Sequence, residues 1–305
     1  PGDNERKLAR ALTANADVLL VDLEDSVSEV RKGAGRQTAA DLLRQQHERR
    51  GDAAGSGVPT APKFYVRINA LSSAHWEDDL RSIVPCRPDG VMLPKSRDGD
   101  DVHRLSVLLG TLEETHEIAP GAIGILALAT ETASAIFNLP TYTGSSTRLV
   151  GLAWGAEDLS AEIGATATRL TGGGWTTPYR LVRDLTLLAA TAADVAAIDS
   201  VYTDIPDLAG LQAEALAAAR DGFSGKMALH PDQVSVINAA FTPSGEDVER
   251  ARAIVQMFEA APEAGVLALD GQMLDRPHLE RARRLLARAG VTSEDVTITQ
   301  EGGAT

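Results

Sequence analysis

The chain has 305 residues, 44% of them hydrophobic and 24% charged, so it can bury a large core as one large domain or two smaller ones. Its 29 Lys and Arg stand against 43 Asp and Glu, a formal net charge of −14, without a basic run; this argues against nucleic-acid binding but leaves an anionic small molecule open. No apolar run approaches the roughly 18 residues of a membrane span. We therefore expect no membrane segment. The single Cys86 cannot form an intrachain disulfide, which fits a reducing compartment and predicts a cytoplasmic protein.

Seven apolar segments of strand length recur along the chain, at residues 18–24, 64–69, 90–95, 123–130, 147–155, 196–203 and 225–230. Segments with helical composition or period lie between them, at 31–50, 179–193 and 208–220, whereas 47–62 is predicted to be a flexible loop. The predicted apolar stripe of the helix 179–193 consists of Leu181, Val182, Leu185, Leu188 and Ala189. Apolar strands that alternate with helices are typical of a parallel sheet covered on both faces.

The number and order of these segments predict an α/β fold, a (β/α)8 or TIM barrel. A closed barrel of this type needs eight strands, and seven are present. The chain opens with "PGDNERKLARAL", a turn followed by a helix, where a strand is expected before the turn. We interpret residues 1–241 as the barrel and expect its first strand to lie upstream of Pro1, missing from the sequence.

Residues 242–305 have a different pattern and are interpreted as a C-terminal lid extension. Ser244 with Asp247 three residues later is a capping-box pattern that predicts a helix start. The side chains of this helix that are expected to face inward are Val248, Ala251, Ile254, Val255 and Phe258. Asp270-Gly271 predicts a hairpin turn, residues 276–289 a last helix, and residues 291–305 a frayed end.

Polar or ionisable residues stand at the carboxyl end of every predicted strand. In chain order they are Glu24 and Asp25, Arg67 and Asn69, Lys95, Glu131, Glu157 and Asp158, Asp204, and His230 and Asp232. In (β/α) barrels this end of the sheet holds the active site. The acidic end of the segment "LLVDLEDSV" therefore predicts a catalytic position for Glu24 and Asp25.

Several carboxylates converging on one site repel one another, and a hard divalent cation such as Mg²⁺ relieves that repulsion. No Cys or His cluster has the spacing of a zinc site. By strand period, Arg67 should point into the site with Tyr65 and Asn69, and its guanidinium would bind a substrate carboxylate.

Each of these residues also has a purely structural interpretation. Asp158 could equally be a helix cap, and Asp204 is more simply a cap or a loop residue. Arg67 and Lys95, taken singly, are as well explained by structural ion pairs. Three further features are also explained without a function. His230 would be a loop histidine, Glu157 a solvent-facing helix residue, and residues 172–174 a flexible glycine loop. Only their joint occurrence at one end of the sheet favours a site.

Nine motifs occur along the chain in a family order: "PGD", "LLVDLEDSV", "FYVRIN", "GVMLPK", "ATETASAI", "WGAEDLSAEIGA", "AIDSVYTD", "GFSGKMALHPDQV" and "GQMLDRP". In these motifs the chain resembles the HpcH/HpaI aldolase group, and within it the citrate lyase β-subunit-like branch of CoA-ester lyases. The resemblance covers about residues 1–290. The chain departs from the group's pattern in lacking the apolar strand that precedes "PG".

The resemblance implies a (β/α) barrel that forms homo-oligomers, commonly trimers, and uses Mg²⁺, with Mn²⁺ as an alternative. Glu131 and Asp158 match the family's two metal ligands, with Glu131 also at the substrate. Glu24 and Asp25 match its acidic pair. Arg67 matches the residue that holds the carboxylate of the 2-oxo acid. Asp275 matches an acid/base aspartate supplied by a neighbouring subunit; only the resemblance singles out this residue.

The activity that the resemblance implies is carbon–carbon cleavage or formation of a β-hydroxyacyl-CoA of the malyl-, methylmalyl- or citramalyl-CoA type, giving an acyl-CoA and a small 2-oxo acid. Three alternatives stay open. They are a malyl-CoA-type thioesterase, a citrate lyase β subunit that works with an acyl-carrier partner, and a CoA-independent metal aldolase. A pure binding protein would not need this acid–base set.

Overall fold

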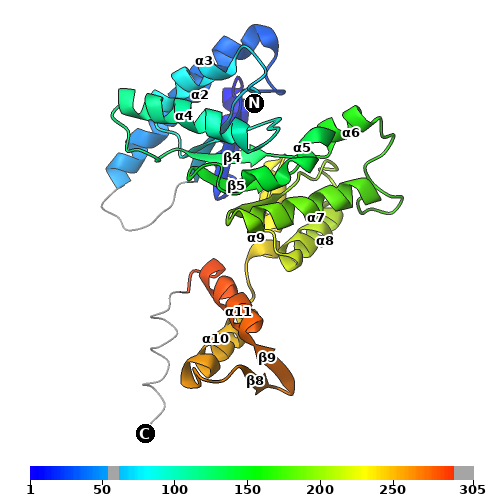
Figure 1. Cartoon of the computed structure of the whole chain (residues 1–305). Coiled ribbons are helices and arrows are strands. Elements are labelled where there is room, and N and C mark those ends of the chain that lie inside the picture. The colour runs from blue at the N-terminus through cyan, green and yellow to red at the C-terminus, as the bar shows by residue number, and fades with distance from the viewer. Residues whose placement is uncertain (54–61, 292–305) are drawn as a thin grey trace. The chain divides into compact units, whose positions relative to one another are not determined.

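The computed structural model describes residues 1–53 and 62–291. It consists of two compact units, Pro1–Asn238 and Ala239–Thr305 (Figure 1). The predicted loop 47–62 is helical up to Ala53, so that prediction was wrong over its first part, and residues 54–61 lie outside the described residues. The predicted frayed end, apart from Val291, also lies outside them.

The first unit is built on seven parallel strands whose order in the sheet is their order in the chain. The strands are β1 Val18–Asp22, β2 Lys63–Arg67, β3 Gly90–Leu93, β4 Gly124–Leu128, β5 Leu149–Ala153, β6 Ala196–Asp199 and β7 Gly225–Lys226. A sequential parallel order without a reversal is that of a (β/α) barrel and differs from the order of a doubly wound sheet. Each predicted apolar segment contains one strand, and each strand ends earlier than predicted because the following residues form the loops at the carboxyl end.

The register places a row of β-branched side chains in the buried layer between the sheet and its helices. Val21 pairs with Val66, Val66 with Val91, and Val91 with Ile125, and all four side chains are fully buried. Burying a side chain of this size stabilises the fold by about 1.5–3 kcal/mol. The same register makes Asp22 the direct neighbour of Arg67 at the carboxyl end.

Glycines on the neighbouring strands make room for Tyr65 of β2. A Cβ atom at Gly90 would lie 2.2 Å from the Tyr65 ring, and one at Gly124 would lie 3.4 Å from its hydroxyl. A side chain at Gly90 would therefore have to displace the ring, which explains why β3 begins with glycine.

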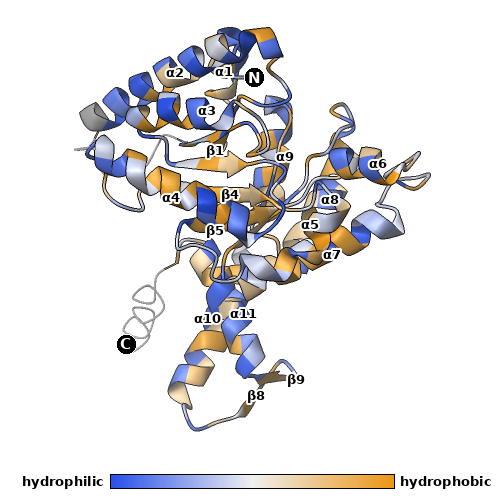
Figure 2. Ribbon diagram, turned by 45° about the horizontal axis from the view of Figure 1, so that its top comes forward, coloured by the Kyte–Doolittle hydropathy of each residue, from blue (hydrophilic) through white to orange (hydrophobic). Residues whose placement is uncertain are grey.

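Helices follow the strands and lie outside the sheet (Figure 1). The α-helices up to residue 241 are α1 Glu5–Ala11, α2 Lys32–Ala53, α3 Trp76–Ile83, α4 Gly99–Thr115, α5 Ala133–Phe137, α6 Glu157–Ile163, α7 Thr177–Ala192, α8 Leu208–Asp221 and α9 Pro231–Phe241. Short 3₁₀ turns occur at Glu29–Arg31, Val84–Cys86 and Leu139–Tyr142. Figure 2 shows hydrophilic and hydrophobic residues side by side along these helices, as expected for helices with one face in solvent and one in the core. Among the described residues no helix combines the length and apolar character of a membrane span.

The predicted apolar stripe of α7 is confirmed at Val182, which is buried, and wrong at Leu181 and Leu188. Leu181 and Leu188 are 57% and 64% exposed, whereas the polar residues Arg183 and Thr186 are buried. Arg183 binds Asp221 at 3.0 Å, and the Thr186 hydroxyl donates to a main-chain carbonyl one turn earlier. Because these polar groups find partners inside the protein, the buried face of α7 does not coincide with its leucines.

The second unit contains two helices and a hairpin, α10 Gly245–Ala260, β8 Val266–Leu269, β9 Gln272–Asp275 and α11 Arg276–Arg288. Ser244 caps α10 by accepting from the main chain of Asp247, as predicted. Asp270 and Gly271 both have positive φ, at 52° and 76°, which is the backbone of the predicted tight hairpin turn. The unit has its own core, made by Ala251, Ile254, Val255, Phe258, Leu274, Leu279, Ala282 and Leu286.

Candidate active site

Five of the predicted site residues gather near Lys95, which follows β3: three carboxylates approach its side chain, Glu131 binds its main chain, and Arg67 joins through Glu24. The Lys95 ammonium lies 2.5 Å from Glu24 Oε1, 3.3 Å from Asp25 Oδ2 and 3.9 Å from Asp158 Oδ2. Its main-chain N–H donates to Glu131 Oε2 at 2.5 Å. We call these residues, together with Arg67, the Lys95 cluster. It joins the carboxyl ends of β1 to β4 with the start of α6.

Arg67 connects to the same group through Glu24, with Nη1 3.1 Å from Glu24 Oε2. Its strongest contact is with Asp22, where Nε and Nη2 donate to the two carboxylate oxygens at 2.7 Å each. The sequence suggested that the guanidinium binds a substrate carboxylate with its planar edge. One edge is already engaged by Asp22, so the N–H groups that remain for a substrate are on Nη1 and Nη2.

Lys95 has a backbone conformation that non-glycine residues rarely adopt, with φ at 50°. This conformation lets one residue use its main chain for Glu131 and its side chain for Glu24. Such outliers persist where the surrounding contacts determine them, and they are common at functional sites. Lys95 was predicted to stand at this end of the sheet, with a structural ion pair as its alternative, and the structure places it at the centre of the cluster.

Burial and neighbouring charges shift the pKa values of the carboxylates in this cluster and of the adjoining Asp22. Burial raises the pKa of Glu131 to about 8, with the nearby Asp158 carboxylate adding to the shift. Burial also raises the pKa of Glu24, against the opposing effect of Lys95 and Arg67. For Asp22, burial alone would raise the pKa, but the hydrogen bonds and charge of Arg67 lower it to about 2. Arg67 thus favours the ionised form of Asp22, whereas burial favours the neutral form of Glu131.

The Glu131 and Asp158 pair fits a hard divalent cation. Asp158 lies close enough to raise the pKa of Glu131, and a pair of neighbouring carboxyl groups favours such an ion. Glu24 Oε2 is a buried oxygen that accepts no hydrogen bond, although Arg67 Nη1 lies 3.1 Å from it. No three Asp, Glu, His or Cys side chains form a closed metal cluster within residues 1–53 and 62–291. A Mg²⁺ ion needs only one or two carboxylates, because water and substrate complete its coordination.

The structure decides several of the structural alternatives. Asp158 is the second residue of α6, the cap position is Ala156, and no side chain caps this helix. Glu157 is exposed, as expected. Asp204 lies exposed in a loop, and Asp207, not Asp204, caps α8. The interpretation of Asp158 as a helix cap was therefore wrong, which favours its role in the cluster.

The expectation that Asn69 points into the site was wrong. Its amide donates to the carboxylate of Asp79 at 2.7 Å and to the carbonyl of Leu23 at 3.1 Å. The period-two argument fails because β2 ends at Arg67, so Asn69 belongs to the loop. His230 is a loop histidine that accepts from the main chain of Asp232 at 3.3 Å, and it makes no contact with the Lys95 cluster among the described residues.

A second ionic group, the Lys226 cluster, lies at the ends of β6 and β7. The ammonium of Lys226 is completely buried and binds Asp199 Oδ2 at 2.8 Å, the Ser200 carbonyl at 2.7 Å and Glu214 Oε1 at 2.7 Å. The indole N–H of Trp154 donates to the other oxygen of Asp199 at 2.8 Å. Because the Lys226 ammonium is fully buried and has three close partners, we interpret this cluster as structural.

Asp275 lies in the second unit, where it caps α11. It shares a reciprocal capping box with His278, whose Nδ1 is 2.5 Å from Asp275 Oδ1. This hydrogen bond lowers the pKa of Asp275, so the residue is a carboxylate at neutral pH. An Asp at the cap position with a proline in the first turn, here Pro277, is an ordinary signal of a helix start. The sequence pattern therefore favours a cap, and only the resemblance points to acid–base chemistry.

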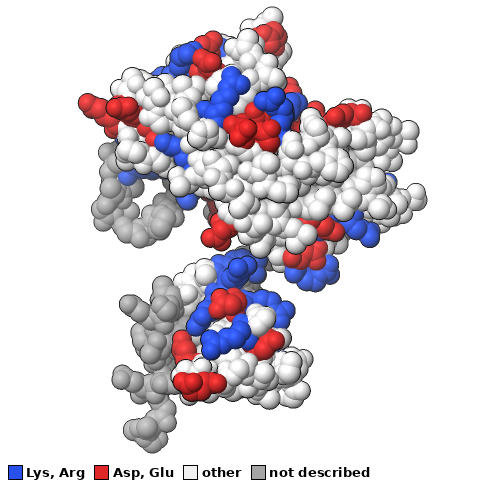
Figure 3. Space-filling view, in the orientation of Figure 1, with Lys and Arg blue, Asp and Glu red and all other residues white. Residues whose placement is uncertain are grey.

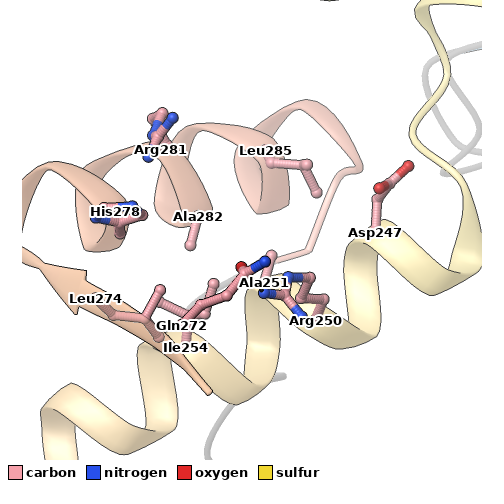
Figure 4. Close-up of a pocket in the computed structure, with 10 residues that line it drawn as sticks. All are labelled: Asp247, Arg250, Ala251, Ile254, Gln272, Leu274, His278, Arg281, Ala282 and Leu285. Carbon is pink, nitrogen blue, oxygen red and sulfur yellow. Dashed lines mark hydrogen bonds between the residues drawn. The ribbon is translucent and has the colours of Figure 1, made fainter. Parts of the chain in front are cut away.

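The second unit also has a groove of about 320 Å³ between α10, β9 and α11 (Figure 4). Its lining combines apolar side chains such as Ile254 and Leu274 with Arg250, His278 and Arg281. It contains none of the residues of the Lys95 cluster. Figure 3 shows basic and acidic side chains close together on the visible faces of both units.

Comparison with known proteins agrees with this architecture. The family model described as HpcH/HpaI aldolase/citrate lyase matches residues 1–231, and one described as a C–C bond lyase of the TIM-barrel fold matches residues 177–293. A citrate lyase subunit beta-like protein of Mycobacterium tuberculosis is 35% identical over 96% of this chain and 95% of its own. A (3S)-malyl-CoA thioesterase of Cereibacter sphaeroides is 29% identical over 95% of this chain and 92% of its own.

Among solved structures, the CitE protein of Mycobacterium tuberculosis in complex with magnesium, acetoacetate and coenzyme A is 34% identical. The similarity covers 95% of this chain and 96% of that chain, with a TM-score of 0.74. The fold is thus a TIM barrel, and the enzyme is of the carbon–carbon lyase class. The chain belongs to the HpcH/HpaI aldolase/citrate lyase family.

Proposed function

We propose that this enzyme is a Mg²⁺-dependent lyase that cleaves or forms a β-hydroxyacyl-CoA of the malyl-, methylmalyl- or citramalyl-CoA type. The products of cleavage are an acyl-CoA and a small 2-oxo acid. The observation that carries the proposal is the Lys95 cluster, where a partly exposed set of carboxylates lies beside the Arg67 guanidinium, which is paired with Asp22 and Glu24. The similar CitE structure, which contains magnesium, a 3-oxo acid anion and coenzyme A, supports the substrate class.

Glu131 and Asp158 would hold the metal, with Glu24 and Asp25 next to it. When bound, Mg²⁺ supplies charge neutralisation and polarises the oxygen at the carbon that becomes the oxo group. The chain itself contributes a low-dielectric pocket for Glu131, which is 4% exposed. The ammonium of Lys95 keeps the remaining carboxylates in place.

Arg67 would bind the carboxylate of the 2-oxo acid through Nη1 and Nη2. Asp22 holds the opposite edge of the guanidinium, so these N–H groups have one fixed direction. Fixing the carboxylate end of the substrate restricts its reacting carbon to one position. Such positioning supplies a large part of the rate enhancement in reactions of this kind.

Asp275 would transfer the proton at the α-carbon of the acyl-CoA. In cleavage, the substrate hydroxyl releases its proton to water and its carbon becomes the carbonyl of the oxo acid. The electrons of the breaking C–C bond move into the thioester as an enolate, and Asp275, protonated for this direction, delivers a proton to the enolate carbon. In synthesis the aspartate removes that proton. Because His278 lowers the pKa of Asp275, the resting enzyme holds the form needed for synthesis. We propose that Asp275 comes from a neighbouring subunit of a homo-oligomer, a trimer by resemblance.

The test is to incubate the purified chain with Mg²⁺ and a panel of esters that includes malyl- and citramalyl-CoA, and to follow oxo acid and free thiol separately. We expect oxo acid to form together with an acyl-CoA, and this to stop with EDTA. No turnover in either channel would contradict the proposal and indicate that an acyl-carrier partner is required.

A second candidate is hydrolysis of a malyl-CoA-type thioester. The similarity to the (3S)-malyl-CoA thioesterase favours it, because that protein aligns with nearly the whole chain. The same assay separates the two functions, since a thioesterase releases free thiol without an oxo acid.

A further inference from the structure

Asp22, the last residue of β1, has no role in the proposed reaction so far, yet four hydrogen bonds hold its carboxylate. Its side chain is buried, and each carboxylate oxygen accepts two hydrogen bonds. Oδ1 accepts from Arg67 Nε at 2.7 Å and from the main chain of Glu24 at 2.9 Å. Oδ2 accepts from Arg67 Nη2 at 2.7 Å and from the main chain of Ser26 at 3.2 Å.

These four contacts occupy the acceptor positions of the carboxylate, so Asp22 has no lone pair left for a metal or a substrate. Any effect on the reaction must therefore pass through its neighbours. One neighbour is the guanidinium of Arg67. The other is the turn that carries Glu24 and Asp25.

The turn has a second, independent support. The buried Lys32 donates from Nζ to the carbonyls of Leu23 at 2.9 Å and Glu24 at 2.8 Å. Lys32 has no contact with Arg67 among the described residues. Asp22 and Lys32 thus share one task, holding the turn, and only Asp22 also holds Arg67. This difference provides a matched control.

We propose that Asp22 is a positioning residue that fixes the Arg67 guanidinium and the Glu24–Asp25 turn in one geometry, so that the carboxylate of the oxo acid and the acidic pair keep a constant separation. This inference rests on the proposed function, in which Arg67 binds that carboxylate. A two-bond contact to a planar guanidinium restricts its rotation, whereas a single bond would leave it free to turn. Asp22 lies opposite Arg67 in the sheet register, so both partners start from fixed main-chain positions.

The test is a kinetic double-mutant cycle with Asp22→Asn, Arg67→Lys and the double variant, in the condensation direction with 2-oxo acid as the varied substrate. Asp22→Asn is expected to lower kcat/KM about 100-fold, chiefly by raising KM for the oxo acid. In the Arg67→Lys background the same change should cost less than about threefold, because the residue it positions is gone. Losses that multiply in the double variant would overturn the inference.

Lys32→Met is the matched control, since it removes two hydrogen bonds from the turn and leaves the Asp22–Arg67 pair. We expect it to lower kcat with little change in KM for the oxo acid. If Lys32→Met reproduces the full KM effect of Asp22→Asn, Asp22 acts through the turn alone and the inference is wrong. Circular dichroism and thermal unfolding of each variant check that the fold is retained.

A crystal structure of Asp22→Asn gives a readout that does not depend on turnover. The guanidinium of Arg67 should leave its place or occupy more than one rotamer. An unchanged guanidinium would overturn the inference even if activity falls. If instead the wild type lacks lyase turnover while the variant structure shows the displaced Arg67, the proposed function is wrong and the positioning of Arg67 by Asp22 stands.

Discussion

The Lys95 cluster and the Lys226 cluster lie at the same end of one sheet and use the same chemistry, yet they are built differently. Lys226 is fully buried, and each of its three partners is a protein oxygen within 2.8 Å. The Lys95 side chain is 31% exposed, and two of its partners, Asp25 and Asp158, are 59% and 41% exposed and more than 3 Å away. A closed ionic group stabilises one structure, whereas a partly open one with unequal contacts has places left for a ligand.

The most direct test of this difference is to replace one glutamate by glutamine in each cluster. Glu131→Gln in the Lys95 cluster is expected to lower kcat/KM by about 10³-fold or more, because the metal loses a ligand. Thermal stability of the metal-free variant should stay the same or rise, since the pKa of Glu131 shows that the ionised form is disfavoured. Kinetics and unfolding scans measure the two effects.

Glu214→Gln is the matched change in the Lys226 cluster, where Glu214 binds Lys226 at 2.7 Å and Arg169 at 2.5 Å. We expect a loss of stability and little change in kcat at a temperature where the variant is folded. The comparison would fail if Glu214→Gln abolished turnover in a folded protein while Glu131→Gln did not.

Asp275→Asn tests the ion pair that lies outside both clusters. Removal of a proton-transfer group should lower kcat by about 10³-fold while Mg²⁺ binding and fold are retained. Asp270→Asn, on the same hairpin, is the control, because Asp270 is exposed and, within the part of the chain that the structure describes, pairs with Arg250 alone at 3.3 Å. Equal activities of the two variants would remove Asp275 from the mechanism.

Replacing the two lysines separates stability from activity. Lys226→Met leaves Asp199 and Glu214 without their buried partner and should destabilise the fold by about 3–5 kcal/mol. Lys95→Met should cost less, because Asp25 and Asp158 are 59% and 41% exposed and the buried Glu24 keeps Arg67 at 3.1 Å, but it should impair turnover. Chemical denaturation of both variants gives the free energies of unfolding. Equal losses would mean that the clusters differ in position only.

The pH dependence of metal binding gives a further test of the Lys95 cluster. The pKa of Glu131 is raised to about 8 in the folded, metal-free enzyme, above that of an unfolded glutamate. Its neutral form thus stabilises the fold fully below about pH 4.3, and this contribution is lost as the pH rises toward 8. Mg²⁺ has to displace the proton, so its affinity should fall by up to about tenfold per pH unit from 8 to 6. Calorimetry in buffers of different ionisation enthalpy would detect the released proton, and Glu131→Gln should abolish the effect.

The smallest expected effect concerns surface residues that belong to neither cluster. Leu181→Gln and Leu188→Gln on α7 replace exposed side chains and should change stability by no more than about 0.5 kcal/mol. Val182→Ala on the same helix should cost more, because Val182 is only 3% exposed. Thermal unfolding of the three variants would show whether the leucines are as free as the structure has them.

The sequence predicted the strands and their carboxyl ends well, because apolar runs and the polar residues that follow them are local signals. It also brought Glu24, Asp25, Arg67, Glu131 and Asp158 to one end of the sheet, since parallel strands share their direction. It did not predict which of these groups touch. The pairing of Asp22 with Arg67 depends on the register of two strands 45 residues apart, which no local pattern encodes.

The errors have physical causes of the same kind. Periodicity assigned the leucines of α7 to the core, but Arg183 is buried instead because Asp199 and Asp221 lie within reach of it. Asn69 was assigned to the site by extending the period of a strand beyond its last residue. In both cases a distant polar partner, invisible in the local sequence, decided where the side chain lies.

The left-handed backbone of Lys95 has a mechanical consequence. Through its amide and its ammonium, one residue after β3 ties Glu131, which follows β4, to Glu24, which follows β1. The ends of two strands that are not neighbours in the sheet are thereby linked through one residue, and opening either bond releases the link. The amide proton of Lys95 reports on the Glu131 half of this link, because its exchange with solvent requires the bond to Glu131 to open.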